Sequence, residues 1–338
     1  MTATSAAPFL RHAGIELPII GGAMYPCSNP ELVAAVSESD GIGIIQPISL
    51  TYVHGHDFRG GIRLIRSLTS RPIGMNALIE SYSKKYHERM RSWLEIAIEE
   101  GVRFVVTSLG NPRWVCELVH SAGGVVYHDV TERKWAEKAL AGGVDGLIAV
   151  NNRAGGHAGS LSLERLIDEV GGLGVPVIAA GGIATPAQFS SAMQLGYAGI
   201  QMGTRFIATK ECSSSEAYKQ AIVRAQAADI VLSEKLTGVP VAVINTPYIA
   251  RMGLTAGPLA RWMLRGRRTR HWMRTFYALN SVWKLKRSAL SESPSSDYWQ
   301  AGKSAGDIDS VVPVADIMNQ FRIEYQSRGS PPPPPTSP

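Results

Sequence analysis

The chain has 338 residues, of which 45% are apolar and 18% are charged, so it can bury a large core and wholesale disorder is excluded. Its 34 basic and 28 acidic residues give a net charge of +6, which raises the question of an anionic partner. The three cysteines lie far apart, which argues against a disulfide framework and against a structural zinc site. Because the N-terminus carries no signal-peptide pattern, a cytoplasmic protein is expected.

Eight short β-rich runs follow one another along the chain, and each leaves room for a helix before the next. Apolar runs without alternation, as in residues 175–180, are typical of strands buried on both faces of a parallel sheet. Eight such units predict an α/β protein with a closed TIM (β/α)8 barrel, and an open doubly wound sheet is the alternative. The expected strands are residues 17–22, 43–47, 73–78, 104–108, 124–128, 146–150, 175–180 and 199–202.

The pattern predicts five parts of the chain. Residues 170–204 lack charged side chains, but glycines and prolines interrupt them too often for a transmembrane segment. The tail has six prolines in ten residues and is expected to be disordered. The parts are an N-terminal arm (1–14), the barrel core (15–210), an Arg/Trp-rich insertion expected to be helical (211–297), a C-terminal segment that returns to the barrel with a helix at 314–325 (298–328), and the tail (329–338).

Two neighbouring loops at the expected carboxyl end of the barrel are rich in glycine. The loop after the seventh strand contains Gly181 and Gly182 and leads into a helix at Pro186, where free N–H groups favour a phosphate. The loop after the eighth strand contains Gly203, Thr204 and Arg205. Barrel enzymes often hold phosphate between these loops, so a phosphate site is predicted, with tight turns alone as the alternative.

Polar side chains also follow other strands. His157 lies among glycines after the sixth strand, where a neutral imidazole could act as a base, and an exposed loop histidine is the alternative. Asn76 ends the third strand and could offer a donor and an acceptor to a planar heterocycle. His128 and Cys27 are interpreted as packing residues, since no local partner activates the thiol.

The ordered set of motifs resembles the nitronate monooxygenase family, formerly called 2-nitropropane dioxygenases. The resemblance covers about residues 15–210 and 298–322, and these motifs also occur in FMN-dependent enoyl-carrier-protein reductases and NADH:quinone reductases of the same fold. The runs that carry it are residues 18–24, 40–43, 154–159, 179–183, 201–206 and 299–306.

The resemblance implies a TIM barrel that binds FMN non-covalently and no metal. It implies that His157 is the catalytic histidine beside the flavin N5 and the substrate. The phosphate would rest on Gly181, Gly182, Gly203 and Thr204. The other expected cofactor contacts are Ala23, Met24, Asn76, Gly155, Gln201 and Met202.

The implied reaction is oxidation of an alkyl nitronate with O2 to a carbonyl compound and nitrite, with His157 positioning the substrate or taking its α-proton. One alternative is NAD(P)H-dependent reduction of an enoyl thioester or a quinone. Another is a non-catalytic subunit that binds a phosphorylated ligand or a partner. We expect a small anionic substrate and consider a homodimer.

Two positions depart from the family pattern. The nitronate-oxidising branch usually has Gln where Val150 stands and an acidic residue where Arg153 stands. Arg153 therefore places a positive charge near the expected active-site mouth, and an anionic substrate would suit it.

Positive charge is concentrated in residues 251–290, and the remaining residues sum to a net charge of −4. One interpretation is a helical pair that packs its aromatic side chains on the barrel, and others are a lid for an anionic substrate or a dock for an acidic partner or membrane surface. Nucleic acid is not expected, because the barrel shows no basic face or known binding motif. The basic residues of the segment, which has no acidic one, are Arg251, Arg261, Arg265, Arg267, Arg268, Arg270, Arg274, Lys284, Lys286 and Arg287.

Overall fold

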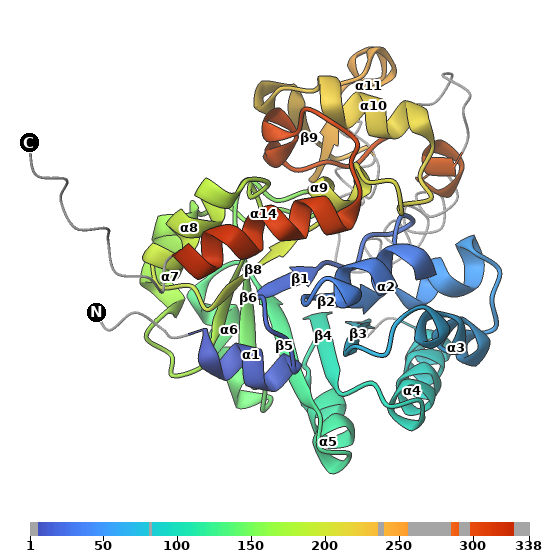
Figure 1. The fold of residues 1–338 in the computed structure, drawn as a ribbon, viewed down its shortest axis with the longest axis vertical. Coiled ribbons are helices and arrows are strands. Elements are labelled where there is room, and N and C mark those ends of the chain that lie inside the picture. Colours follow the sequence, from blue (N-terminus) through green and yellow to red (C-terminus); the bar gives the residue numbers. More distant parts are fainter. Residues whose placement is uncertain (1–5, 81–82, 236–239, 256–284, 291–297, 328–338) are drawn as a thin grey trace, which may run out of the picture.

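The computed structural model describes residues 6–80, 83–235, 240–255, 285–290 and 298–327 (Figure 1). Eight parallel strands hydrogen-bond in chain order, and the first pairs with the last to close a barrel. The predicted TIM barrel is thus confirmed. The strands are β1 (Ile19–Gly21), β2 (Ile42–Ile45), β3 (Ile73–Ile79), β4 (Phe104–Leu109), β5 (Val125–Val130), β6 (Gly146–Val150), β7 (Val177–Ala180) and β8 (Gly199–Met202).

Helices surround the barrel and follow the strands in order. Several begin at a side-chain cap: Asp57, Ser83, Ser162 and Thr185 each accept a hydrogen bond from the backbone N–H three residues further on. The helices are α2 (Pro30–Glu38), α3 (Phe58–Leu68), α4 (Lys84–Glu99), α5 (Arg113–Ser121), α6 (Arg133–Ala141), α7 (Leu163–Val170), α8 (Pro186–Gln194) and α9 (Thr204–Ile207).

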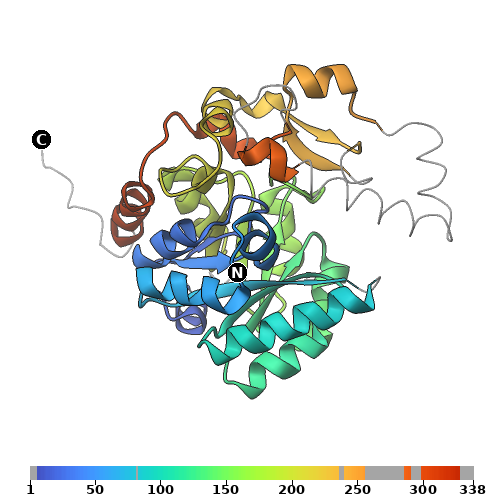
Figure 2. The same ribbon diagram turned by 90° about the vertical axis from the view of Figure 1, so that its right-hand side faces the viewer.

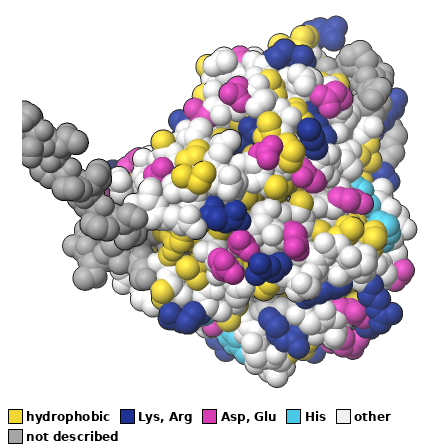
Figure 3. Space-filling view, viewed as in Figure 1, with side chains coloured by type: hydrophobic (Ala, Val, Ile, Leu, Met, Phe, Trp, Pro, Cys, Tyr) yellow, Lys and Arg dark blue, Asp and Glu magenta, His cyan; other side chains and the backbone are white. Residues whose placement is uncertain are grey.

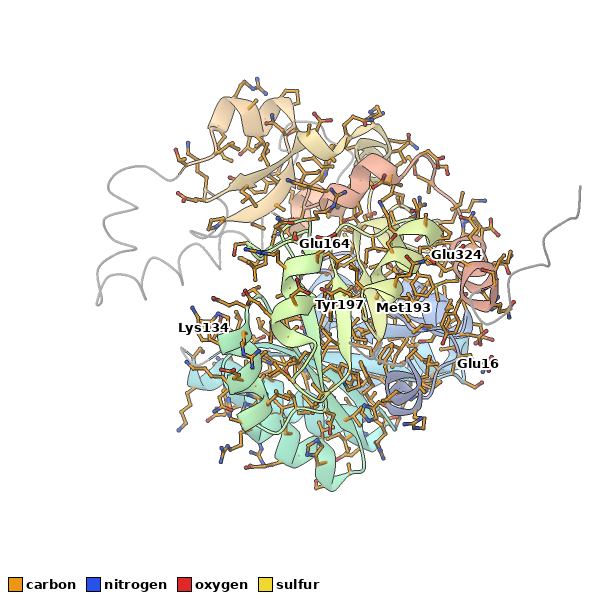
Figure 4. The ribbon with its side chains drawn as sticks, turned by 90° about the vertical axis from the view of Figure 1, so that its left-hand side faces the viewer. Glu16, Lys134, Glu164, Met193, Tyr197 and Glu324 are labelled. Atoms are coloured by element: carbon orange, nitrogen blue, oxygen red, sulfur yellow. The ribbon has the colours of Figure 1, made fainter. Side chains whose placement is uncertain are left out.

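Strand side chains alternate between two apolar layers. One layer fills the lumen of the barrel, and the other packs between the strands and the helices. Tyr197 packs in the second layer and lies between α7 and α8 in Figure 4. Its hydroxyl donates a hydrogen bond to the Leu163 carbonyl (2.8 Å), which connects this layer to the start of α7. The lumen layer includes Ile20, Ile44, Val106, Tyr127, Ile148 and Ile178.

The N-terminal arm is a helix that closes the amino end of the barrel. Helix α1 (Ala7–Ala13) inserts Phe9, which is fully buried, against Phe104 and Tyr127, with ring centroids 6.1 and 5.7 Å away. The same ring packs on Gly199, where an added Cβ would lie 2.9 Å from it. The lumen is therefore filled from below, which leaves only its carboxyl end for a ligand.

The chain after β8 builds an upper lobe, defined here as residues 216–235, 240–255 and 285–290, above the carboxyl end of the barrel (Figures 1 and 2). It contains α10 (Glu216–Arg224), the antiparallel strands β9 (Ile230–Ser233) and β10 (Val241–Ile244), and α11 (Pro247–Met252). The insertion expected to be helical, 211–297, is helical in only part of its described residues, because two runs rich in β-branched residues pair with each other as β9 and β10. Residues 256–284 of the Arg/Trp-rich segment and the proline-rich tail lie outside the described residues.

The C-terminal segment returns to the barrel. Trp299 stacks on Tyr218 of α10 with an interplanar angle of 8°. Residues Lys303–Asp307 form a 3-10 turn, and α14 (Val314–Ser327) then lies beside α2 and α8, with Phe321 and Phe189 rings 5.7 Å apart (Figure 1). The face in Figure 3 intersperses acidic and basic side chains, with no one-sign field on it.

Candidate active site

The β7–α8 loop has the backbone geometry of a ligand cradle. Gly181 and Gly182 have φ angles of +111° and +73°, a region that favours glycine. A Cβ on Gly181 would lie 2.6 Å from the Ala154 backbone nitrogen, so a side chain is excluded there. Among the described residues, no acceptor lies on the backbone N–H groups of Gly182 or Ile183. This loop therefore offers open donors to an anion.

The start of α8 offers fewer donors than the sequence suggested. The Thr185 hydroxyl accepts a hydrogen bond from the Gln188 N–H, and the Gln188 side-chain oxygen accepts from the N–H groups of Ala184 (2.8 Å) and Thr185 (3.2 Å). This capping box satisfies the N–H groups of Ala184, Thr185 and Gln188 from within the protein. In the first turn of α8 this leaves the Ala187 N–H without an acceptor among the described residues, and the other open donors lie earlier, in the glycine loop.

The loop after β8 brings Met24, Gly203 and Thr204 together. A Cβ on Gly203 would lie 3.3 Å from the Met24 sulfur. The Thr204 hydroxyl accepts a hydrogen bond from the Gly302 N–H (2.9 Å), which leaves its proton available. Arg205 is turned away, because its buried guanidinium donates to the carbonyls of Ala208 and Ser310.

Two amide side chains, those of Asn76 and Gln201, lie at the carboxyl end of the lumen. Asn76 on β3 faces the lumen between two residues of the outer layer, and its Nδ2 donates weakly to the Val106 carbonyl (3.4 Å). The Gln201 side chain packs across Gly22, and its buried Oε1 has no partner among the described residues. Such an orphaned acceptor needs a donor, which a ligand can supply. Met202 packs its side chain in the outer layer, so only its backbone reaches this end.

Asp129 joins this ring and was missed from the sequence. It lies two residues after lumen-facing Tyr127 on β5, and its buried Oδ1 has no partner among the described residues. Burial raises the pKa of the Asp129 carboxyl to about 7. The signal that could have found it is an acidic residue at lumen parity in an otherwise apolar strand.

The β6–α7 loop carries His157. Asn151, fully buried at its base, donates from Nδ2 to the Gly181 carbonyl (2.9 Å) and accepts at Oδ1 from the Arg153 N–H (2.8 Å). The Gly156 carbonyl accepts from the Ala242 N–H of β10 (2.8 Å), so the upper lobe braces this loop. The His157 side chain is exposed, yet surrounding protein atoms lower its imidazole pKa, which favours the neutral form near pH 7.

Gly155 and Gly302 touch through their backbones. A Cβ on Gly155 would lie 2.9 Å from the Gly302 nitrogen, so the C-terminal segment requires glycine there. The structure thus brings the loops carrying Gly155, Gly181 and Gly203 together around this segment. Ala23 packs at the edge of the lumen layer, directly before Met24.

His128 and Cys27 are packing residues, as expected. His128 shares a hydrogen bond with the Thr107 hydroxyl (2.8 Å), and burial lowers its pKa to about 4. Cys27 is buried as a free thiol. No cluster of three metal-ligating side chains occurs in the part of the chain that the structure describes.

A family model for nitronate monooxygenase matches residues 8–324. The chain belongs to the nitronate monooxygenase family. It is therefore a flavin-dependent oxidoreductase of this family, and the resemblance inferred from its motifs is confirmed. Within the described residues, no helix is long and apolar enough to cross a membrane.

Two relatives and one solved structure to which the chain is similar carry three different names. A Mycobacterium tuberculosis (strain ATCC 25618 / H37Rv) protein named "(3aS,4S,5R,7aS)-5-hydroxy-7a-methyl-1-oxo-octahydro-1H-indene-4-carboxyl-CoA dehydrogenase" is 26% identical, covering 94% of this chain and 95% of the relative. A Staphylococcus aureus (strain JH9) protein named "Probable nitronate monooxygenase" is 29% identical, covering 72% and 80%. The structure of FabK from Thermotoga maritima is 29% identical, with a TM-score of 0.77, covering 95% and 96%.

The donor set fits a phosphorylated flavin. The glycine loop presents open N–H groups of Gly182 and Ile183 to an anion, and a Cβ would fill the cradle at Gly181. The orphaned Gln201 oxygen lies at the same end of the barrel and can accept from a ring N–H.

Proposed function

We propose that this chain uses FMN as its flavin. The phosphate would be held by Gly181, Gly182, Gly203 and Thr204. The open backbone donors and left-handed glycines of the β7–α8 loop support this assignment. The ring would lie near Ala23, Met24, Asn76, Gly155, Gln201 and the Met202 backbone.

Bound FMN would supply a two-electron acceptor or donor. His157 would hold or move a proton at the substrate carbon beside an electron-withdrawing group. A neutral imidazole suits this task, and the lowered pKa of His157 favours that form. The hydrogen bonds that hold the His157 loop to β10 and to Asn151 would fix the position of the imidazole relative to the substrate.

We further propose an acyl thioester of coenzyme A type as the substrate. The observation that carries this proposal is the location of the described ends of the basic segment. Arg251 lies on α11, and Leu285, directly before Lys286 and Arg287, packs with Val243 of β10 and Ile249 of α11. Because β10 also braces the His157 loop, these three basic residues belong to the lobe that contacts the site. A multiply charged substrate fits this charge better than a small monoanion does.

The end-to-end match with the coenzyme A ester dehydrogenase supports the same choice. Val150 supports it too, because a valine cannot offer the amide that the nitronate-oxidising branch usually has at this position. The second candidate is oxidation of alkyl nitronates with O2, which the family name and the staphylococcal relative favour.

Anaerobic mixing distinguishes these candidates. The purified protein is combined separately with a saturated acyl-CoA, an alkyl nitronate, NADH and NADPH, and flavin absorbance is followed. Bleaching by acyl-CoA, or reoxidation of the reduced protein by the 2,3-unsaturated acyl-CoA, supports the thioester reaction. Bleaching by the nitronate alone replaces it with the second candidate. A colourless protein that takes up no FMN refutes both.

A further inference from the structure

We propose that Arg153 is a ligand of the FMN phosphate rather than of the substrate. This inference rests on the proposed function, because it assumes an FMN site at the glycine loops. It gives a binding role to a residue at which this chain departs from its family.

The Arg153 side chain lies across the glycine loop. A Cβ built on Gly182 would lie 2.5 Å from Arg153 Nε, 2.7 Å from its Cβ and 2.9 Å from its Cδ. The aliphatic stem therefore runs over the α-carbon of Gly182, and the guanidinium begins beside the open N–H groups of this loop.

The backbone of Arg153 is held on both sides. Its N–H donates to Asn151 Oδ1 (2.8 Å), and its carbonyl accepts from the Lys303 N–H (2.9 Å). Asn151 also donates to the Gly181 carbonyl, and this hydrogen bond fixes the distance between the β6–α7 loop and the β7–α8 loop. Arg153 is thus positioned relative to the cradle by the same residues that shape the cradle.

The loop itself lacks a full counter-charge for phosphate. Backbone N–H groups contribute only partial charges, whereas a phosphate monoester carries close to two negative charges at neutral pH. Arg205, the arginine that follows Gly203 and Thr204, donates to the carbonyls of Ala208 and Ser310 and is not available. The forked guanidinium of Arg153 matches phosphate geometry.

Two carboxylates of the described residues lie near Arg153 and leave it free to bind: Glu164, whose pKa is lowered first by its hydrogen bond with Ser162 and also by the charge of Arg153, and Asp307. Arg153 Nη2 is 4.0 Å from Asp307 Oδ2, and these side chains are 43% and 36% exposed. An exposed pair at this distance is weak. The same Asp307 oxygen also accepts from Gln188 Nε2 (2.9 Å), so it has another partner when the guanidinium turns to a phosphate.

The test compares FMN with riboflavin, which has the same ring and no phosphate. Apo-protein is titrated with each flavin, and binding is followed by flavin fluorescence. For Arg153→Met we expect the dissociation constant for FMN to rise about 10- to 100-fold, as for loss of a charged hydrogen bond. The dissociation constant for riboflavin should not change, and unchanged riboflavin binding also shows that the variant folds. Arg153→Lys should recover part of the FMN affinity, because it keeps the charge without the fork.

Arg71→Met is the matched control. Arg71 is 47% exposed and pairs with Glu16 and Asp40 before β3, at the amino end of the barrel. The Arg71→Met variant loses the same charge as Arg153→Met, but far from the glycine loops. The preference of this variant for FMN over riboflavin should therefore match that of the unmodified protein.

Two outcomes overturn the proposal while the proposed function stands. In one, Arg153→Met keeps the full preference for FMN. In the other, FMN affinity is unchanged and only the KM for substrate rises, which would show that Arg153 binds the substrate and not the FMN phosphate. An unmodified protein that binds neither flavin instead refutes the proposed function.

Discussion

Two titratable side chains at the carboxyl end of the barrel have pKa values shifted in opposite directions. Surrounding protein atoms lower the pKa of the exposed His157 imidazole, and burial raises the pKa of the Asp129 carboxyl to about 7, because partial removal of water disfavours the charged form of each group. The pair therefore offers a neutral base and a carboxyl that holds a proton in the same pH range. Shifts of this kind gather at functional sites.

His157→Ala should keep flavin and lose about 100-fold or more of its turnover, the usual contribution of a positioned acid or base. Steady-state kinetics with the accepted substrate, together with flavin content, measure this. In the unmodified protein, the acid limb of the pH–rate profile should fall below 6.5, because the His157 pKa is lowered from that value.

His120→Ala provides the control for this variant. His120 is also exposed, but it pairs with Asp145 at the opposite end of the barrel, so turnover should not change. Full turnover of His157→Ala would show that the histidine has no part in the reaction.

Asp129→Asn should stabilise the protein at alkaline pH. The pKa of Asp129 is about 7 in the fold and near 3.8 in the unfolded chain, so the fold binds the extra proton between these values. The free energy of unfolding therefore falls as the pH rises from 4 to 7, by up to about 4 kcal/mol. The amide removes this penalty.

Urea unfolding at pH 5 and pH 8 measures the effect. The gain of Asp129→Asn over the unmodified protein should be larger at pH 8 than at pH 5. Comparing the two proteins at each pH removes the opposite contribution of His128, whose lowered pKa costs stability as the pH falls from 6.5 to 4. An equal difference at both values would contradict a raised carboxyl pKa.

At the level of elements, the site is assembled by loops that fit backbone against backbone. Gly155 meets Gly302, and Gly181 meets the nitrogen of Ala154. The C-terminal segment thus completes the carboxyl end of the barrel, although Gly302 lies 98 residues after Thr204, whose hydroxyl it contacts.

Gly155→Ala should weaken both folding and FMN binding. Its Cβ would lie 2.9 Å from the Gly302 nitrogen and 3.2 Å from the Ala301 carbonyl carbon, so backbone must move. Overpacking of this kind costs about 1–3 kcal/mol. Urea unfolding and FMN titration measure the two effects.

Gly172→Ala is the matched control, since a Cβ there meets nothing within 4 Å. It should leave stability and FMN affinity as they are. If Gly155→Ala behaved like this control, the contact with the C-terminal segment would not constrain the site.

At the level of the whole molecule, the amino end of the barrel contributes to stability, whereas the carboxyl end carries the candidate active site. Helix α1 closes the amino end, and the upper lobe covers the carboxyl end (Figure 2). Changes to the two ends should therefore have separate effects.

Phe9→Ala should cost about 3–5 kcal/mol of unfolding free energy, because a fully buried ring leaves a cavity. Turnover per folded molecule at low temperature should remain. Leu68→Ala on α3, 47% exposed, is the control and should change little. A Phe9 variant with normal stability and reduced turnover would reverse the expected division.

The sequence by itself predicted parallel strands with a helix after each, because unbroken apolar runs are typical of strands buried on both faces, and the number of units favoured a barrel. The pairing of β1 with β8 then decided between a closed barrel and an open sheet. The sequence also located His157 and the two glycine loops, since such loops follow strands seven and eight. Asp129, at lumen parity in an apolar strand, and Thr185 with Gln188, at capping-box spacing, carry signals that can be read in the sequence. The role of Asn151 cannot be read there, because it depends on the Gly181 carbonyl that folding brings close.

Tertiary structure decided three further points. It paired β9 with β10 where a helix was expected, since pairing across a loop outweighs local preference. It turned the N-terminal arm into the helix that closes the lumen. It also placed Arg153 on Gly182 and directed Arg205 away, although the sequence puts Arg205, and not Arg153, in a glycine loop, because only packing decides where a long side chain points.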